Sequence, residues 1–339
     1  MTCDNQLCFS CMKELTAPGG ICPHCGHNNQ HRDNGPGMLG SIMLNNQYQV
    51  GKVLGRGGFG ITYIGYDHNL QTRVAIKEYY PAHLVQRNKD DITVSALSGS
   101  DKDYQRGVER ALRESRMAAG LRNIPGVVQV YNVFQANHTV YIVMDYVEGK
   151  TLSHYVQDHS GRVLLPEAIH LLAPVARALQ ALHSRNVIHR DVKPDNIMIH
   201  RETGEGICVI DLDTTMPGLS INDFGDSIRF GANHSKEDEK DLSKVNFDIE
   251  LYKIYTRGFL EGAQGGLTDA ELEYLPWGAK LMTLECGIRF LTDYLDGDHY
   301  FRIHYADQNL DRCRTQFKLV KDMEEQFDAM AAVIRKYAK

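Results

Sequence analysis

The spacing of hydrophobic residues predicts strands in the first half of the chain. Short runs in which apolar and polar residues alternate are typical of β-strands with one buried face. Residues 50–54 and 61–64 alternate in this way, and the mainly apolar runs of residues 74–77, 127–131 and 140–144 also indicate strands. A helical pattern interrupts them from about residue 104 to 121. We therefore expect an antiparallel sheet accompanied by one helix.

The second half of the chain has the longer spacing that is typical of amphipathic helices. Helical patterns cover residues 164–184, 247–260 and 309–337. Thr268 and Glu271 have the spacing of a capping box, which predicts a further helix start. Together the two halves predict an α+β fold with an antiparallel β lobe followed by a mainly α lobe.

A polar loop between two short apolar segments joins the halves. Residues 188–198 read Ile-His-Arg-Asp-Val-Lys-Pro-Asp-Asn-Ile-Met. Asp191 can accept the proton of an attacking hydroxyl, and Asn196 offers a neutral oxygen to Mg²⁺. Lys193 adds a positive charge for a transferring phosphate. The loop therefore predicts phosphoryl-transfer chemistry.

A glycine-rich segment lies between the first two predicted strands. Its glycines are Gly55, Gly57, Gly58 and Gly60. Because a strand follows them, they predict a hairpin whose amides can approach phosphate oxygens, with a plain glycine-rich hairpin as the alternative. Lys77, at the end of the next strand, would bind phosphates and needs an acidic partner. The predicted helix offers Glu109 and Glu114, which face different sides of it.

Two Cys-x-x-Cys pairs stand near the N-terminus, and they are formed by Cys8, Cys11, Cys22 and Cys25. Four thiolates from two such turns complete a tetrahedral zinc site, and a segment of this length needs a metal to stay folded. Residues 1–30 therefore predict a structural zinc ribbon, with redox-active thiols as the alternative. Residues 31–45 are polar and rich in Gly and Pro, and we expect a linker there.

Composition narrows the class of protein. With 42% hydrophobic and 24% charged residues the chain can bury a large core. A net charge of -6 argues against a general nucleic-acid binder. No apolar run approaches the roughly 20 residues that span a bilayer, and the polar N-terminus does not resemble a signal peptide. We expect a cytoplasmic protein that binds neither nucleic acid nor membrane.

Up to residue 196 these motifs resemble bacterial Ser/Thr protein kinases that carry an N-terminal zinc ribbon. The resemblance implies a bilobal protein-kinase-like fold, with an N-lobe at residues 46–144 and a C-lobe at residues 145–339. It favours Glu114 as the partner of Lys77, because residues 112–117 resemble the corresponding kinase helix. A hinge would follow the last strand, where Asp145 and Val147 would contact adenine.

The same resemblance selects the metal aspartate. In protein kinases this residue lies about a dozen positions after the catalytic-loop Asn and ends a strand. Asp211 lies 15 residues after Asn196 and ends an apolar run, so we expect it to bind Mg²⁺, with Asp213 as a helper. Asp223 begins the tripeptide Asp-Phe-Gly but ends no strand, and we expect a structural or substrate-side role for it.

Residues 186–335 also resemble the aminoglycoside phosphotransferase superfamily, most of all N-acetylhexosamine 1-kinase. The similar segments are residues 208–218, 222–231 and 282–294. No Ala-Pro-Glu anchor for a peptide follows Asp213, and the helices of residues 215–339 would enclose a small-molecule pocket. The sugar-side candidates are Asp226, Arg229, Arg289 and Arg302, with Glu285, Asp293, Tyr300 and Arg312 as further polar groups. Salt bridges within the lobe are the alternative for each.

The resemblances together imply an ATP- and Mg²⁺-dependent kinase in which Asp191, Lys193 and Lys77 are catalytic. The expected acceptor is a hydroxyl of a small sugar such as an N-acetylhexosamine. A Ser/Thr protein kinase is the first alternative, supported by Lys193 and the Pro194 that follows it. A catalytically impaired chimeric kinase that acts as a binding module is the second.

Overall fold

The computed structural model describes most of the chain, which forms two compact units. The described residues are 6–35, 37–121, 123–185, 187–189, 192–200, 206–210, 216–217, 219–263 and 265–338, with the backbone alone for 206–209 and 216–217. The first unit comprises Met1–Asn123 and Val128–Glu148. The second comprises Ile124–Val127 and Gly149–Lys339.

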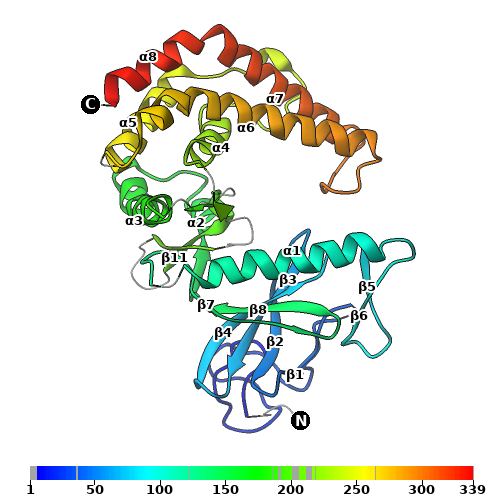
Figure 1. Cartoon of the computed structure of the whole chain (residues 1–339). Coiled ribbons are helices and arrows are strands. Elements are labelled where there is room, and N and C mark those ends of the chain that lie inside the picture. Colours follow the sequence, from blue (N-terminus) through cyan, green and yellow to red (C-terminus); the bar gives the residue numbers. More distant parts are fainter. Residues whose placement is uncertain are drawn as a thin grey trace. The chain divides into compact units, whose positions relative to one another are not determined.

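A six-stranded antiparallel sheet dominates the first unit (Figure 1). Its strands, in spatial order, are β1 (Met43–Leu44), β2 (Tyr48–Arg56), β3 (Gly60–Asp67), β4 (Thr72–Tyr79), β8 (Thr139–Asp145) and β7 (Val130–Ala136). Consecutive residues are buried in the central strands, as Thr139–Val143 of β8 show, so both faces of the sheet are covered there. Val50, Tyr63, Ile76 and Val143 are fully buried in the core of this unit.

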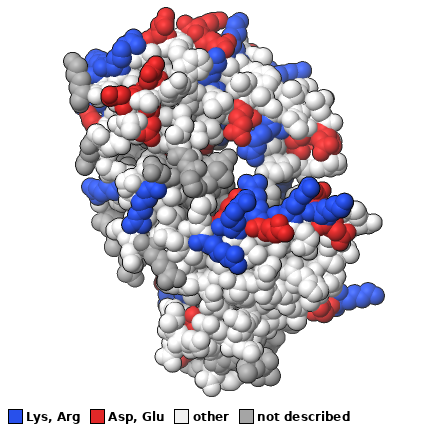
Figure 2. Space-filling view, in the orientation of Figure 1, with Lys and Arg blue, Asp and Glu red and all other residues white. Residues whose placement is uncertain are grey.

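One helix and a small hairpin complete the fold around this sheet. The helix α1 (Asp101–Ala119) buries Tyr104, Val108 and Ala118, and Tyr104 stacks on Tyr79 of β4 with ring centroids 6.0 Å apart. Its opposite face is charged, and Figure 2 shows basic and acidic side chains together over it. The hairpin consists of β5 (Val85–Arg87) and β6 (Val94–Ala96).

Short strands in the second unit frame the predicted phosphoryl-transfer loop. One sheet has the order β12 (Gly206–Val209), β11 (Ile197–His200), β9 (Gly149–Thr151). A second pairs β10 (Val187–Ile188) with β13 (Met216–Pro217). A 3₁₀ turn, η1 (Pro194–Asn196), leads into β11. Two ladders therefore hold the chain immediately before and after the loop.

Helices make up the rest of the second unit. They are α2 (Leu152–Asp158), α3 (Leu165–His183), α4 (Ile221–Gly231), α5 (Ile249–Ala263), α6 (Asp269–Leu295), α7 (Gln308–Glu325) and α8 (Phe327–Tyr337), with a 3₁₀ turn η3 (Leu242–Lys244). The capping box of Thr268 and Glu271 opens α6, which confirms that prediction. None of the helices within the described residues is both long and apolar enough to cross a bilayer.

Two glycines allow α4 and α6 to cross at close range. A Cβ added at Gly225 of α4 would lie 2.2 Å from the carbonyl oxygen of Gly278. A Cβ added at Gly278 of α6 would lie 2.3 Å from the carbonyl oxygen of Ile221. Any side chain at either position would separate the helices, so this crossing depends on both glycines.

Some predicted elements have different bounds in the structure. The strand expected at residues 127–131 begins at Val130 and continues to Ala136. The helix expected at residues 309–337 is two helices, α7 and α8, because the chain leaves helical geometry at Gln326 (φ -107°, ψ 12°). The Gln326 side chain there donates to the carbonyl of Phe247 at 3.2 Å.

The segment expected as a linker, residues 31–45, packs on the first unit. Leu39 is fully buried, and Asn34 donates to the carbonyls of Leu39 and Gly51 at 2.6 and 2.9 Å. The first unit continues to Glu148, beyond the expected lobe boundary at residue 144.

Candidate functional site

The glycine-rich segment forms a hairpin between β2 and β3, as the sequence predicted. Gly57 donates its backbone N–H to the carbonyl of Gly60 at 2.9 Å. At Gly55, Gly57 and Gly58, no atom of the described residues lies within 4 Å of an added Cβ. Gly60 differs, because its Cβ would lie 2.5 Å from the Glu78 carbonyl oxygen. There is therefore open space beside three of the glycines, and the fourth is required by packing.

Lys77 lies on β4, where its backbone pairs with Thr62 of β3 and Ile142 of β8. The adjacent Glu78 is fully buried in a polar cluster that sequence reasoning did not find. Arg87 binds both Glu78 carboxylate oxygens, at 2.7 and 2.6 Å. The hydroxyls of Tyr63 and Tyr141 donate to the same carboxylate at 2.9 and 3.0 Å. These bonds fix the strand that carries Lys77.

In this cluster the positive charge of Arg87 balances the negative charge of Glu78, and the two tyrosines stay neutral. Burial and the nearby charge of Glu78 raise the pKa of both Tyr63 and Tyr141, which keeps the hydroxyls protonated as donors. Burial opposes the charge of Arg87, but its hydrogen bonds and attraction to Glu78 outweigh burial and raise its pKa. No motif links positions 78 and 87, so only the fold reveals the pair.

Glu114, the expected partner of Lys77, is nearly buried on α1, 9% exposed. Its carboxylate accepts a hydrogen bond from Nε of Arg110, one turn earlier, at 2.8 Å. This is an i,i+4 contact along the helix, with an exposed partner in Arg110. The pairing of Glu114 with Lys77 stays a prediction.

At the expected hinge, Asp145 stabilises the end of the sheet. Its carboxylate accepts from the backbone N–H of Gln129 at 2.9 Å and from the hydroxyl of Tyr131. The bond to Asp145 raises the pKa of Tyr131 to about 12. The Asp145 amide donates to the Gln129 carbonyl at 3.0 Å, so it is already used within the sheet. A contact between Val147 and adenine stays a prediction.

The phosphoryl-transfer loop is described at both ends. Asp191, Asp211 and Asp213 lie outside the described residues. Asn196 is buried at the end of η1, where its amide donates to the Lys193 carbonyl at 2.9 Å. Ile210, which precedes Asp211 in the chain, donates its amide to the Asn196 carbonyl at 2.9 Å. The backbone leading to one predicted Mg²⁺ ligand is therefore bonded to the other.

Asp223, which begins the Asp-Phe-Gly tripeptide, holds the start of the loop. It is 3% exposed on α4 and accepts from the His189 backbone N–H at 2.9 Å. His183, at the end of α3, lies with Nε2 2.8 Å from the same oxygen. Phe224 is fully buried in the helical core, and Gly225 makes the helix crossing described above. The three residues thus serve the architecture of the second unit, in line with the structural role expected for Asp223.

Two of the expected sugar-binding residues bind each other. Arg229 Nε lies 3.1 Å from Oδ1 of Asp226, and Arg229 Nη1 lies 3.0 Å from Oε1 of Glu237. The Arg229 side chain is 11% exposed. Burial opposes its charge, but Asp226, Glu237 and Cys286 raise its pKa. This geometry matches the alternative of an ion pair within the lobe.

Other expected sugar-side residues stabilise the segment between α6 and α7. Asp293 accepts from the backbone N–H groups of Tyr300 and Phe301 at 2.7 and 2.9 Å. Arg289 donates to the Tyr300 hydroxyl at 3.2 Å. Arg312 donates to the carbonyl of Arg302 at 3.4 Å. A role of these residues toward an acceptor stays a prediction.

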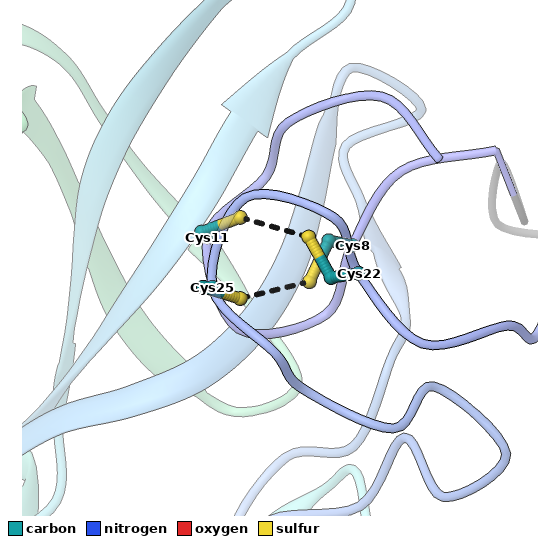
Figure 3. A group of neighbouring side chains, drawn as sticks. All are labelled: Cys8, Cys11, Cys22 and Cys25. Atoms are coloured by element: carbon teal, nitrogen blue, oxygen red, sulfur yellow. Dashed lines mark hydrogen bonds between the residues drawn. The ribbon is translucent and has the colours of Figure 1, made fainter. Parts of the chain in front are cut away.

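The four N-terminal cysteines converge, as Figure 3 shows. Their sulfurs all lie within 4.8 Å of one another, with Cys8 to Cys25 and Cys11 to Cys22 both at 3.7 Å. Both turns have the same bonding, because Met12 donates to the Cys8 carbonyl and Gly26 to the Cys22 carbonyl, each at 2.9 Å.

The cluster fits a zinc ion. Four sulfurs bound to Zn²⁺ at about 2.3 Å are about 3.8 Å apart in a tetrahedron, which agrees with the 3.7 Å separations. Burial opposes ionisation of Cys22, but the backbone N–H groups of His24 and Cys25 lower its pKa to about 7. Burial raises the pKa of Cys8 and Cys11, so a cation is needed to hold them as thiolates.

Comparisons with known proteins match the part of the chain that carries the glycine hairpin and the phosphoryl-transfer loop. The model of the protein kinase domain matches residues 48–244, more than half of the chain. The Ser/Thr protein kinase PknA of Nostoc sp. is 30% identical over 221 residues, 62% of this chain and 36% of that protein. The Ser/Thr protein kinase PrkC of Bacillus subtilis is 25% identical over 250 residues, 74% of this chain and 32% of that protein.

A further relative and a solved structure agree with this match. A probable Ser/Thr protein kinase of Streptomyces coelicolor is 36% identical over 163 residues, 47% of this chain and 21% of that protein. The chain thus spans about a fifth to just over a third of these three relatives. The apo form of PpkA-294 has the same fold, with a TM-score of 0.51 and 22% identity over 88% of this chain and 99% of that chain.

These three relatives bear on the two resemblances found in the sequence. Two are named as Ser/Thr protein kinases and the third as a probable one. They support the expectation drawn from the first half of the chain. The expected resemblance to N-acetylhexosamine 1-kinase finds no support among them.

Proposed function

The chain belongs to the protein kinase family, and from this membership we propose that it transfers the γ-phosphoryl group of ATP to Ser or Thr hydroxyls of proteins. The observation that carries the proposal is the bonding of the loop ends in the second unit. His189 donates its amide to Asp223, and its imidazole Nε2 lies 3.1 Å from the Ile210 carbonyl. Asn196 and Ile210 are joined through their backbones. These bonds fix the described ends of the loop.

The proposed roles follow from the chemistry of each side chain. The hairpin of Gly55, Gly57 and Gly58 lies over the ATP phosphates, and Lys77 neutralises their charge. Asp191 orients the acceptor hydroxyl and accepts its proton. Lys193 stabilises the charge on the phosphoryl group in transfer.

Asn196 and Asp211 are the proposed ligands of Mg²⁺. One carboxylate and one amide oxygen are the ligand types that Mg²⁺ takes beside phosphate oxygens and water. The burial of Asn196 and its short 3₁₀ turn fit this assignment, because they restrict the side chain to few orientations. When bound, the ion neutralises charge on the phosphates.

A protein acceptor agrees best with the comparisons, and the bonding of Asp226 and Arg229 supports it. These two side chains are already paired with each other and with Glu237. A sugar would have to replace these bonds to use both side chains.

A sugar acceptor remains the second candidate because of the C-terminal helices. The match to the kinase domain ends at residue 244, so α5 to α8 lie outside it. The resemblance to N-acetylhexosamine 1-kinase that the sequence of residues 186–335 suggested would make an anomeric hydroxyl the acceptor.

A three-way assay separates these possibilities. Purified protein is incubated with Mg²⁺ and ATP labelled on the γ-phosphate, with either generic protein acceptors or free N-acetylhexosamines. Labelled phosphoserine or phosphothreonine supports the proposal, and a labelled sugar 1-phosphate contradicts it. Nucleotide binding without transfer indicates the binding module. Lys77→Met serves as the control, because it should lower transfer to every acceptor.

A further inference from the structure

The first cysteine turn is joined to the strand that leads into the glycine hairpin. The carbonyl of Phe9, between Cys8 and Cys11, accepts the backbone N–H of Lys52 at 2.9 Å. The pairing of β2 with β3 shifts register between Val50 and Val53. The interruption in the ladder therefore coincides with the point at which the cysteine turn binds β2.

Side-chain packing at the same point is close. A Cβ added at Gly51 of β2 would lie 2.2 Å from Cε of Met12 and 2.5 Å from the Phe9 carbonyl oxygen. Met12 is 2% exposed and packs with Leu7 and the fully buried Ile64 of β3. A glycine at position 51 is therefore required for the first cysteine turn to pack against the sheet.

The two cysteine turns differ at one equivalent position. Met12 follows Cys11 with a left-handed φ of 53°, where Gly26 follows Cys25 with φ 73°. A side chain is unfavourable in this conformation, so a methionine there needs a compensating contact. The packing of Met12 against β3 supplies that contact. The second turn has no such residue at this position, and its neighbour Ile21 is 71% exposed.

We infer that the metal-bound cysteine cluster braces the nucleotide-binding hairpin, so that Zn²⁺ occupancy and ATP affinity are coupled. Gly55, where the hairpin glycines begin, follows Lys52 by three residues on the same strand. Zn²⁺ fixes the shape of the turn that presents the Phe9 carbonyl and Met12. Without the ion, β2 loses both contacts next to the hairpin. The inference rests on the proposed function, because it concerns the regulation of that same ATP site.

Reciprocal linkage provides a test that does not depend on catalysis. If Zn²⁺ strengthens nucleotide binding by some factor, nucleotide must strengthen Zn²⁺ binding by the same factor. We expect a factor of about five or more, the lower end of typical coupling between sites. The affinity for a non-hydrolysable ATP analogue is measured with the zinc-loaded protein and after chelation. The Zn²⁺ affinity is measured by competition with a chromogenic chelator, with and without the analogue.

Met12→Gly tests the contact while keeping all four cysteines. It gives the first turn the residue that the second turn has at Gly26, so the turn itself should still bind one Zn²⁺. We expect the zinc-loaded variant to bind the analogue about fivefold more weakly than zinc-loaded wild type does. The factor by which the analogue strengthens Zn²⁺ binding should fall toward one in the variant. Ile21→Ala, an exposed change in the same cluster, should leave both affinities unchanged.

The outcomes separate this inference from the proposed function. Equal analogue affinity in wild type with and without zinc, or in zinc-loaded wild type and Met12→Gly, would overturn the inference while leaving the kinase assignment intact. Absence of nucleotide binding in every state would instead overturn the proposed function. Circular dichroism shows whether chelation unfolds the protein. If it does, the analogue affinities of zinc-loaded wild type and zinc-loaded Met12→Gly decide whether the inference holds.

Discussion

The carboxylate of Asp223 binds the backbone N–H of His189 and lies 2.8 Å from Nε2 of His183, through the same oxygen. One buried side chain on α4 therefore joins the end of α3 to the start of the phosphoryl-transfer loop. A carboxylate can only accept, so His183 Nε2 carries a proton in this bond. The proposed catalytic residue Asp191 follows His189 by two positions.

Replacing Asp223 by Ala should slow phosphoryl transfer without changing the metal requirement. The substitution leaves the buried His189 N–H unpaired, which costs about 1–3 kcal/mol of stability. Displacement of the loop should lower kcat by about 10- to 100-fold. Steady-state kinetics at several Mg²⁺ concentrations check this. A large rise in the Mg²⁺ concentration needed for half-maximal rate would show that Asp223 is a metal ligand instead.

The hairpin glycines should separate into one structural and three functional positions. Gly60→Ala places a Cβ 2.5 Å from the Glu78 carbonyl and should destabilise the first unit by about 1–3 kcal/mol. Gly58→Ala meets open space among the described residues and should change stability by less than about 0.5 kcal/mol. It should still raise KM for ATP about fivefold, because a methyl group obstructs the phosphates. Urea unfolding and ATP titration measure the two effects, and identical behaviour of both variants would refute the division.

Arg87→Met should destabilise the first unit strongly. The change removes the partner of a carboxylate that is fully buried, and such losses cost about 3–5 kcal/mol. The double variant Glu78→Gln with Arg87→Met should lose less than the single variant, because no buried charge then stands unpaired. Urea unfolding of the wild type, the two single variants and the double variant checks this. Additive losses would show that the two side chains act independently.

Glu114→Ala and Arg110→Ala should differ if Glu114 serves the nucleotide site. Loss of Glu114 should raise KM for ATP about tenfold, or ~1.4 kcal/mol, by releasing Lys77. Loss of Arg110, whose side chain is 63% exposed, should leave KM within about twofold. ATP titrations of the two variants decide between the roles. Equal KM values would assign Glu114 to the helix alone.

Features that arise from the local spacing of residues could be predicted from the sequence. Alternation along β2 and β3 marks the sheet, because one face of each strand must be buried. The spacing of Cys8, Cys11, Cys22 and Cys25 predicted a shared site, because two such turns present four sulfurs to one centre.

Features that depend on tertiary contact were beyond the sequence. Glu78 of β4 and Arg87 of β5 meet although their strands belong to different sheets, and no sequence spacing encodes that contact. The break at Gln326 involves no Pro or Gly, and its side chain binds the distant Phe247 carbonyl. In the sequence Met12 has no feature that sets it apart from other apolar residues. Only the structure shows that its side chain packs against Gly51.

The most direct measurement of the central claim is γ-phosphate transfer by wild type and Asp191→Asn to a Ser/Thr protein acceptor, alongside the affinity of each for ATP. The account predicts that the variant binds ATP as wild type does and transfers no phosphate above background, because the amide cannot take the hydroxyl proton. Transfer by Asp191→Asn at the wild-type rate would contradict it.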